Sequence, residues 1–202
     1  IEHGGPFSRY FENFESRPQQ LEMLRSIANA LSKSQHLMVE AGTGTGKSFA
    51  YLIPAVEWAI KNSLRVVIST NTITLQDQLI KKDIPDLAAA LNSEVRTTVI
   101  KGRGNYLCPR RYSALRKNNP ETADELRVLA KTLVWLSQGG SGDRGEINLN
   151  GPAEREVWQR ISAEDEGCRA DVCISRTGGA CPFYRAHMAA QSAHILVVNH
   201  AL

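Results

Sequence analysis

The stretch Ala41-Gly42-Thr43-Gly44-Thr45-Gly46-Lys47-Ser48 decides the fold of this chain. It fits the phosphate-loop pattern, with alanine in place of the first glycine. Glycines let backbone N–H groups turn inward around phosphates, and the N-terminus of a following helix adds further donors and a positive dipole end. In such a loop Lys47 is expected to reach the β- and γ-phosphates of ATP, and Ser48 to ligate the Mg²⁺ that bridges them.

The sequence on either side of this loop predicts a strand before it and a helix after it. Leu37-Met38-Val39 is a short apolar strand candidate, and a helix is expected from about Gly46 to Ile60. This order favours a phosphate loop over a Gly/Thr-rich turn that binds nothing. Further strands are expected at Leu64–Ser69 and Val95–Ile100, with a helix starting after Thr72. Strands that alternate with helices predict an α/β fold with a parallel sheet.

The alternation stops between about Gly102 and Gln191. Helices are expected there at Glu121–Leu136, Ala153–Ile161 and Tyr184–Gln191. His194–Val198 then has the apolar composition of a buried strand and returns to the sheet. We interpret the intervening region as an insertion between two strands. The expected segments are residues 1–101, 102–191 and 192–202.

The basic residues are unevenly distributed along the chain. It has 202 residues, 42% of them hydrophobic, and a net charge of +3. This composition indicates a globular protein, and no apolar run approaches the roughly 18 residues that cross a bilayer. Seven of the 24 basic residues lie between Arg96 and Lys117, a segment without acidic residues, which leaves 17 basic against 21 acidic residues elsewhere. Such a segment predicts a polyanionic partner such as nucleic acid; an ordinary solvated face is the alternative.

All four cysteines fall inside the expected insertion. They are Cys108, Cys168, Cys173 and Cys181, and the last three follow the spacing C-x₄-C-x₇-C. Four cysteines are too few for a disulfide scaffold in a chain of this size, and nothing suggests export, so metal ligation is favoured. Four thiolates can hold a [4Fe–4S] cluster. Zinc also accepts four thiolates, so the spacing alone leaves both open.

Several segments resemble one family of helicases. Residues 40–48 resemble the phosphate loop of superfamily-2 helicases, and closely that of the DinG-type iron–sulfur helicases related to XPD. Arg17-Pro18-Gln19-Gln20 resembles the Q motif of that family, and residues 69–76 resemble its motif Ia. Residues 101–108 resemble the segment that leads into the cluster domain, and residues 197–202 the strand before the Walker B box. The resemblance is weakest in residues 118–151.

This resemblance implies a fold and a division of the chain. The fold would be a RecA-like parallel sheet with helices on both faces, incomplete, interrupted by a mainly helical and loop-containing iron–sulfur insertion. Residues 1–101 would form the N-terminal part of the first motor domain, residues 102–191 the insertion, and residues 192–202 the return strand. The chain would stop before Walker B, because neither Asp124-Glu125 nor Glu164-Asp165-Glu166 follows a strand. We therefore assign helicase activity to a longer parent protein and expect this chain alone not to unwind DNA.

The resemblance also assigns roles to individual residues. Gln20 would read the adenine edge, since an amide both donates and accepts hydrogen bonds. Gln19 would have this role if the motif were aligned one residue earlier. Ala41 to Ser48 would hold ATP and Mg²⁺, with Lys47 and Ser48 as the catalytic pair. The four cysteines would hold the [4Fe–4S] cluster. The residues expected to contact DNA are Thr70, Asn71, Thr72, Arg103, Arg110, Arg111 and Tyr112.

Some of these assignments have alternatives. Thr72 suits a helix cap as well as a phosphate contact. We expect Tyr112 to be exposed, where it would stack on bases, and Phe183 to pack beside the cluster. The implied partner is single-stranded DNA, or DNA with a single-stranded overhang, bound by a monomer in the bacterial cytoplasm near the nucleoid.

The leading functional hypothesis is an ATP-dependent DNA helicase, 5′→3′ as in the resembled family, acting in DNA repair or replication. One alternative is a cluster-containing DNA-binding module without ATP turnover. Another is a phosphate-loop kinase with a zinc insertion. Gln20 and residues 69–76 argue against the kinase, because a small-molecule kinase needs neither.

Overall fold

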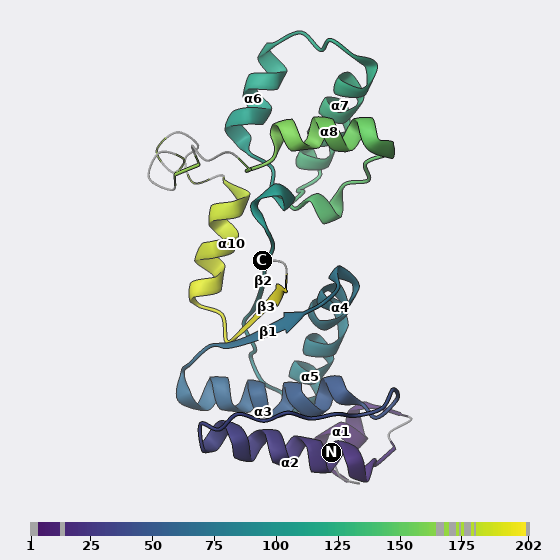
Figure 1. The fold of residues 1–202 in the computed structure, drawn as a ribbon, viewed down its shortest axis with the longest axis vertical. Coiled ribbons are helices and arrows are strands. Elements are labelled where there is room, and N and C mark those ends of the chain that lie inside the picture. The colour runs from purple at the N-terminus through teal and green to yellow at the C-terminus, as the bar shows by residue number, and fades with distance from the viewer. Residues whose placement is uncertain are drawn as a thin grey trace. The chain divides into compact units, whose positions relative to one another are not determined.

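The structure is a computed structural model that describes residues 4–12, 15–164, 168–169, 173, 175, 179 and 181–200 (Figure 1). The chain divides into two compact units. The first unit comprises Ile1–Ile100 and Ala190–Leu202, and the second comprises Lys101–Ala189. Among the helices in the described ranges, none combines the length and apolar character needed to span a membrane.

A parallel three-stranded sheet forms the centre of the first unit. Its strands are β1 (Val66–Thr70), β2 (Thr97–Ile100) and β3 (Ile195–Asn199), in the order β1-β3-β2. β3 runs parallel to both neighbours, and its Ile195 is paired with Val66 on one side and Thr97 on the other. Their β-branched composition suits a pleated surface that packs against helices. The predicted α/β fold with a parallel sheet is confirmed.

Helices of the first unit cover one face of this sheet. They are α1 (Pro6–Tyr10), α2 (Pro18–Ser32), α3 (Lys47–Asn62), α4 (Ile73–Gln78), the π-helical turn η1 (Leu79–Asp83) and α5 (Ile84–Leu91). Leu52, Val56 and Ala59 recur at helical spacing along α3 and pack against Ile195 and Val197 of β3. α2 lies alongside α3 (Figure 1). The sheet thus fixes the direction of α3, which carries the phosphate loop at its start.

The opposite face of the sheet is less covered. Successive side chains of a strand point to opposite faces, so Leu196 lies on the other side from Ile195. There it packs with Ile100 and with Ala190 at the end of α10 (Pro182–Gln191). Val67 of β1 keeps 57% of its surface exposed.

The predicted strand at residues 37–39 is wrong. The sheet of the described residues has three strands, and this segment is not one of them. Met38 is 97% exposed, and its apolar neighbours Leu37 and Val39 are also exposed. A strand is stabilised by the ladder of hydrogen bonds to a neighbouring strand, which apolar composition alone does not supply.

The second unit is mainly helical. It contains η2 (Arg103–Asn105), α6 (Pro109–Lys117), α7 (Ala123–Ser137), η3 (Arg144–Glu146), α8 (Gly151–Ile161) and most of α10. The three predicted helices of this region are confirmed, and α6 is an additional helix that the sequence reasoning missed. A small core gathers the buried side chains of Leu107, Val128, Trp158 and Ile161.

Buried carboxylates join two helices of this unit. Glu154 of α8 accepts hydrogen bonds from Lys131 Nζ of α7 at 2.7 and 3.0 Å, and its side chain is almost fully buried. Glu125 of α7 pairs with Arg160 of α8. Hydrogen bonds from Lys131 hold the pKa of Glu154 below its usual value. The pKa of Glu125 is also lowered, mainly by a hydrogen bond from the backbone N–H of Glu121 and next by the hydrogen bond from Arg160.

Candidate nucleotide-binding and cysteine sites

The phosphate loop ends directly at the N-terminus of α3. Gly44 and Gly46 have φ values of 80° and 76°, a left-handed conformation that favours glycine. Gly46 is the N-cap of α3, and no side chain caps the helix there. The first N–H groups of a helix lack partners within the helix and carry its positive dipole end. The N-terminus of α3 is therefore suited to receive an anion, as the sequence predicts.

Lys47 folds back over the loop that precedes it. Its Nζ donates to the carbonyl oxygens of Ala41 at 2.8 Å and Gly42 at 2.9 Å. Thr45 Oγ1 donates to the same Gly42 carbonyl at 3.0 Å. The ammonium group lies within the loop, where the oxygens of a phosphate could replace the two carbonyls as its acceptors.

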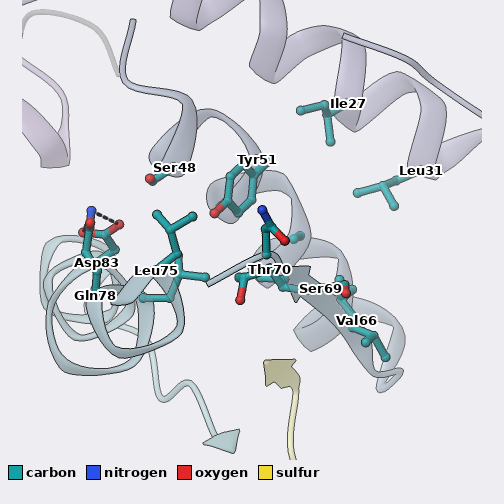
Figure 2. A pocket seen from close by; sticks show the side chains of 15 residues that line it. Ile27, Leu31, Ser48, Tyr51, Val66, Ser69, Thr70, Leu75, Gln78 and Asp83 are labelled. Carbon is teal, nitrogen blue, oxygen red and sulfur yellow. Dashed lines mark hydrogen bonds between the residues drawn. The ribbon is translucent and has the colours of Figure 1, made fainter. Parts of the chain in front are cut away.

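Ser48 lies at the edge of a pocket of about 460 Å³ (Figure 2). The pocket is lined by residues from α2, α3, β1 and the α4–η1 segment. Ser48 hydrogen-bonds with the Tyr51 side chain, and burial with the nearby Asp83 carboxylate raises the pKa of that tyrosine. Gln78 Nε2 donates to Asp83 Oδ2 at 3.1 Å. The hydroxyl expected to ligate Mg²⁺ thus belongs to a polar group at one end of a mostly apolar pocket.

The first turn of α2 contacts the phosphate loop directly. Gln20 is 7% exposed, and its Nε2 donates to the Gly46 carbonyl at 2.9 Å. A Cβ atom on Gly46 would lie 2.2 Å from that nitrogen, so the close approach requires glycine. Gln20 therefore supports the loop in this structure, and its role in reading adenine stays a prediction. Gln19 is exposed.

Arg17 is a loop contact that the sequence reasoning missed. Its NH1 donates to the Gly44 carbonyl at 2.6 Å, while NH2 pairs with Glu15 at 3.1 Å. The available signal was a cation beside the Q-motif glutamines. It could not be used from sequence alone, because Arg17 and Gly44 lie 27 positions apart.

The segment after β1 is built mainly of structural contacts. Thr70 is 7% exposed, and its hydroxyl donates to the carbonyls of Thr72 and Val198. The Thr70 hydroxyl is thus engaged inside the first unit, and its contact with DNA stays a prediction. Thr72 Oγ1 accepts from Leu75 N at 3.2 Å and caps α4, which confirms the helix-cap alternative. Asn71 is exposed and stays a candidate DNA contact.

The predicted exposure of Tyr112 is wrong. Its ring is 5% exposed and belongs to the core of the second unit, on the same face of α6 as Leu115. The physical reason is the helical phase of α6, a helix that was not predicted. Buried in this way, Tyr112 cannot stack on a base. Phe183 instead packs against Tyr106, with ring centroids 5.6 Å apart, as the core-packing expectation required.

The predicted basic contacts have different environments. Arg111 NH1 donates to the Ser162 carbonyl at 2.9 Å, which directs it toward its own unit. Arg110 is exposed on α6. Arg103 is exposed on η2, with its guanidinium 5.2 Å from the centre of the Phe183 ring. The DNA-binding role of these arginines stays a prediction.

The four cysteines are free thiols in one electrostatic neighbourhood. Cys108 and Cys181 are buried, and Cys168 and Cys173 are partly buried. Burial raises the pKa of Cys168, and Cys173 and Cys181 raise it further, Cys173 also through a side-chain hydrogen bond. Burial likewise raises the pKa of Cys181, with contributions from Cys173 and Cys108. Charges shift a pKa in this way only at short range.

The described residues do not form a ready-made metal site. Within the part of the chain that the structure describes, no three His, Cys, Asp or Glu side chains are grouped so that they could hold a metal ion. The segment that joins Cys168 to Cys181 lies largely outside the described residues. The ligand set therefore stays a prediction.

Of the two acidic segments considered for a Walker B box, only Asp124-Glu125 lies wholly within the described residues. Asp124 and Glu125 lie in the first turn of α7, with Glu125 buried against Arg160. Glu164 follows α8, and the two acidic residues after it lie outside the described residues. The sequence-based rejection of Asp124-Glu125 is confirmed.

Comparison with known proteins places these features in a family. Residues 17–110 match the DEAD/DEAH box helicase family. Relatives include the ATP-dependent helicase DinG of Mycobacterium tuberculosis, 35% identical over 204 residues, and the ATP-dependent DNA helicase DinG of Salmonella typhimurium, 32% identical over 206 residues. The 3'-5' exonuclease DinG of Bacillus subtilis is 31% identical over 196 residues.

These alignments cover most of the chain but a minor part of each relative. They include 92%, 94% and 96% of this chain, respectively, but only 30%, 28% and 20% of the relatives' lengths. The matched family segment contains the phosphate loop, Gln20 and β1, which the structure brings together around the start of α3. Residues 17–110 therefore resemble the DEAD/DEAH box helicases, and the chain is similar to DinG helicases over most of its length.

Proposed function

We propose that this chain provides the ATP-binding and DNA-binding part of an ATP-dependent DNA helicase. The observation that carries the proposal is the uncapped N-terminus of α3 behind a glycine-rich loop, with Lys47 and Ser48 in its first turn. The helicase names of two relatives support it. Because the chain spans less than a third of those relatives, the activity is proposed for the parent protein.

The residues of the loop suggest how ATP would be held. Backbone N–H groups at the start of α3 would donate to phosphate oxygens, favoured by the helix dipole. Lys47 Nζ would exchange the carbonyls of Ala41 and Gly42 for the β- and γ-phosphates. Ser48 would turn its hydroxyl from Tyr51 to Mg²⁺, an ion that neutralises phosphate charge when bound. Gln20 and Arg17 would keep the loop open through the carbonyls of Gly46 and Gly44.

The DNA partner and the direction of movement are narrower parts of the same proposal. We infer single-stranded DNA, or DNA with a single-stranded overhang, from the basic segment between Arg96 and Lys117 and from the family resemblance. Movement 5′→3′, a role in DNA repair or replication, a monomeric state and a location at the bacterial nucleoid rest on the resemblance.

The four thiols are proposed to hold a [4Fe–4S] cluster. Their shared electrostatic neighbourhood supports this, because a cation centre would relieve the mutual repulsion that disfavours several thiolates together. When bound, the cluster would act as a cross-link. Cys108 would tie the start of α6, and Cys181 the start of α10, to the segment that contains Cys168 and Cys173.

The ATP part is tested by calorimetric binding of ATP-Mg to this chain. Lys47→Ala is expected to lower the affinity at least about tenfold, because it removes a charge-assisted contact to phosphate. Lys33→Ala, which removes an equal charge at the exposed end of α2, is the control and should bind like wild type. In the parent protein, Lys47→Ala should abolish ATPase activity. If the wild-type chain does not bind ATP, the result would instead favour a DNA-binding module without ATP turnover.

The cluster part is tested on anaerobically purified protein. Broad visible absorption near 400 nm, with about four irons and four acid-labile sulfides per chain, is expected from a [4Fe–4S] centre. Cys108→Ser should lose iron and absorption together. Stoichiometric zinc in colourless wild-type protein would overturn the iron–sulfur assignment, and iron fully retained in Cys108→Ser would remove Cys108 from the ligand set.

A further inference from the structure

A second pocket, of about 490 Å³, lies entirely within the second unit. It is formed by residues of η2, η3 and α8, by Gly102 before η2, and by Glu164 after α8. Three arginines line it: Arg103 from η2, Arg144 from η3 and Arg155 from α8. Among the lining residues that the structure describes, Glu164 is the one carboxylate, so these residues together carry a formal charge of +2.

The three arginines differ from other cations of this unit. Lys101 pairs with Asp143, Lys131 with Glu154, and Arg160 with Glu125. In contrast, no carboxylate within the described ranges forms an ion pair with Arg103, Arg144 or Arg155. Arg155 Nε donates to the Gly151 carbonyl at 2.9 Å, a neutral acceptor that positions the guanidinium. Concentrated, unneutralised positive charge in a pocket attracts an anion.

The floor of the pocket is rigid. Trp158 is 2% exposed, and its Nε1 donates to the Gly104 carbonyl at 2.8 Å, which anchors η2 to α8. A Cβ atom on Gly104 would lie 2.7 Å from Glu164 Oε1, so glycine permits the close approach of that side chain. A site whose backbone is fixed beforehand loses less entropy when it binds a ligand.

We propose that this arginine pocket binds phosphate groups of a single-stranded DNA backbone. Guanidinium groups match phosphate oxygens in a forked geometry. The buried Trp158 ring has no face available for a base, so the pocket would grip the backbone without reading sequence. The inference rests on the proposed function and deepens it: it assigns the strand contact to Arg103, Arg144 and Arg155, and removes it from Tyr112 and Arg111.

The test measures binding of a fluorescein-labelled 20-nucleotide oligothymidine to the full chain by anisotropy at several salt concentrations. The double variant Arg144→Gln/Arg155→Gln should weaken binding at least about tenfold at low salt. It should also lower the slope of log K against log salt by about 1.4, since each lost phosphate contact removes roughly 0.7. Lys33→Gln/Lys61→Gln, which removes the same number of exposed charges from helices of the first unit, is the matched control.

A gain of affinity gives an independent readout. Glu164→Gln removes the carboxylate from the pocket and should tighten DNA binding about twofold to fivefold, an effect that a structural role of the arginines does not predict. Circular dichroism melting should be the same for all variants. Unchanged affinity and salt slope in the double variant, with wild-type DNA binding intact, would refute the pocket but leave the proposed function standing.

Two further outcomes separate the sources of phosphate. If wild type fails to bind DNA at all, the DNA part of the proposed function falls together with the pocket. If inorganic phosphate displaces the oligonucleotide at micromolar concentration, and only when Arg144 and Arg155 are present, the pocket is a free-anion site and the backbone assignment is wrong. Competition only at tens of millimolar phosphate supports the backbone assignment.

Discussion

At the scale of single residues, two independent constraints require glycine at position 46. Its φ of 76° lies in the left-handed region, and Gln20 Nε2 occupies the space where a side chain would begin. Gly42, four positions earlier in the same loop, has neither constraint: its backbone is not left-handed and no atom lies within 4 Å of a Cβ built there. The two glycines therefore offer a matched pair for testing how the loop is supported.

Gly46→Ala is expected to damage nucleotide binding, and Gly42→Ala to spare it. The left-handed conformation costs a residue with a Cβ about 1–2 kcal/mol, and the clash would also displace the Gln20 amide from the loop carbonyl. Calorimetry with ATP-Mg should show at least about tenfold weaker binding for Gly46→Ala and less than about threefold for Gly42→Ala. Equal effects of the two changes would contradict this account of the loop.

At the scale of secondary-structure elements, a single threonine defines where α4 begins. Thr72 has an extended backbone, and its hydroxyl accepts the hydrogen bond from Leu75 N. The helix then continues from Ile73 through the π-helical turn η1 into α5. Pro85 lies in the first turn of α5 and does not end the helix, because the wider π-helical turn precedes it.

Thr72→Ala should destabilise the first unit by about 0.5–2 kcal/mol, the usual loss for an N-cap. Thr74→Ala, on the exposed surface of the same helix, is the control and should change stability little. Urea unfolding followed by circular dichroism measures both. If Thr72→Ala leaves stability unchanged but weakens oligothymidine binding, the side chain serves as a DNA contact, and its role as a cap is refuted.

At the scale of the whole molecule, the two units are stabilised in different ways. The first has an apolar core between α3, α5 and the sheet, which includes Leu52, Leu87 and Ile195. The second adds buried ion pairs between α7 and α8 to a smaller apolar core, with Glu154 almost fully buried beside Lys131. Breaking a buried ion pair is strongly destabilising. The stability of the second unit should therefore depend on pH.

Acid is expected to destabilise the second unit. The pKa values of Glu154 and Glu125 are lower in the folded chain than the usual 4.5. Above the pKa that these carboxyl groups have in the unfolded chain, both contribute fully to the stability of the second unit. This contribution is lost as the pH falls through their pKa values in the folded chain. Fluorescence of Trp135 and Trp158 in a Trp58→Phe background should show declining stability below about pH 4.5.

Glu154→Gln provides the test of cause for this acid effect. It should lower stability at pH 7 and flatten the dependence of stability on pH, because the titrating group is gone. Glu156→Gln on the exposed side of the same helix should do neither. A wild-type stability that is constant from pH 7 to pH 3 would show that the buried ion pairs do not control the second unit.

Local patterns predicted the parts of the structure that depend on neighbouring residues. The start of α3 and the parallel sheet were confirmed, since each follows from short-range backbone preferences and periodicity. The phosphate-binding role of the loop stays a prediction. The segment of residues 37–39 and the side chain of Tyr112 were predicted wrongly. Residues 37–39 form no strand because no strand among the described residues pairs with them. The burial of Tyr112 depends on which face of α6 packs against the core, and α6 was not predicted.

The sequence by itself therefore determined that this chain has a glycine-rich loop before a helix, a parallel sheet, and a long, mainly helical segment between two of its strands. Only the tertiary structure decided which distant side chains support that loop, namely Arg17 and Gln20, and which arginines line a common pocket. The physical reason is range. Backbone conformation is set by residues a few positions apart, whereas burial and ion pairing depend on segments that packing brings together from tens of positions away.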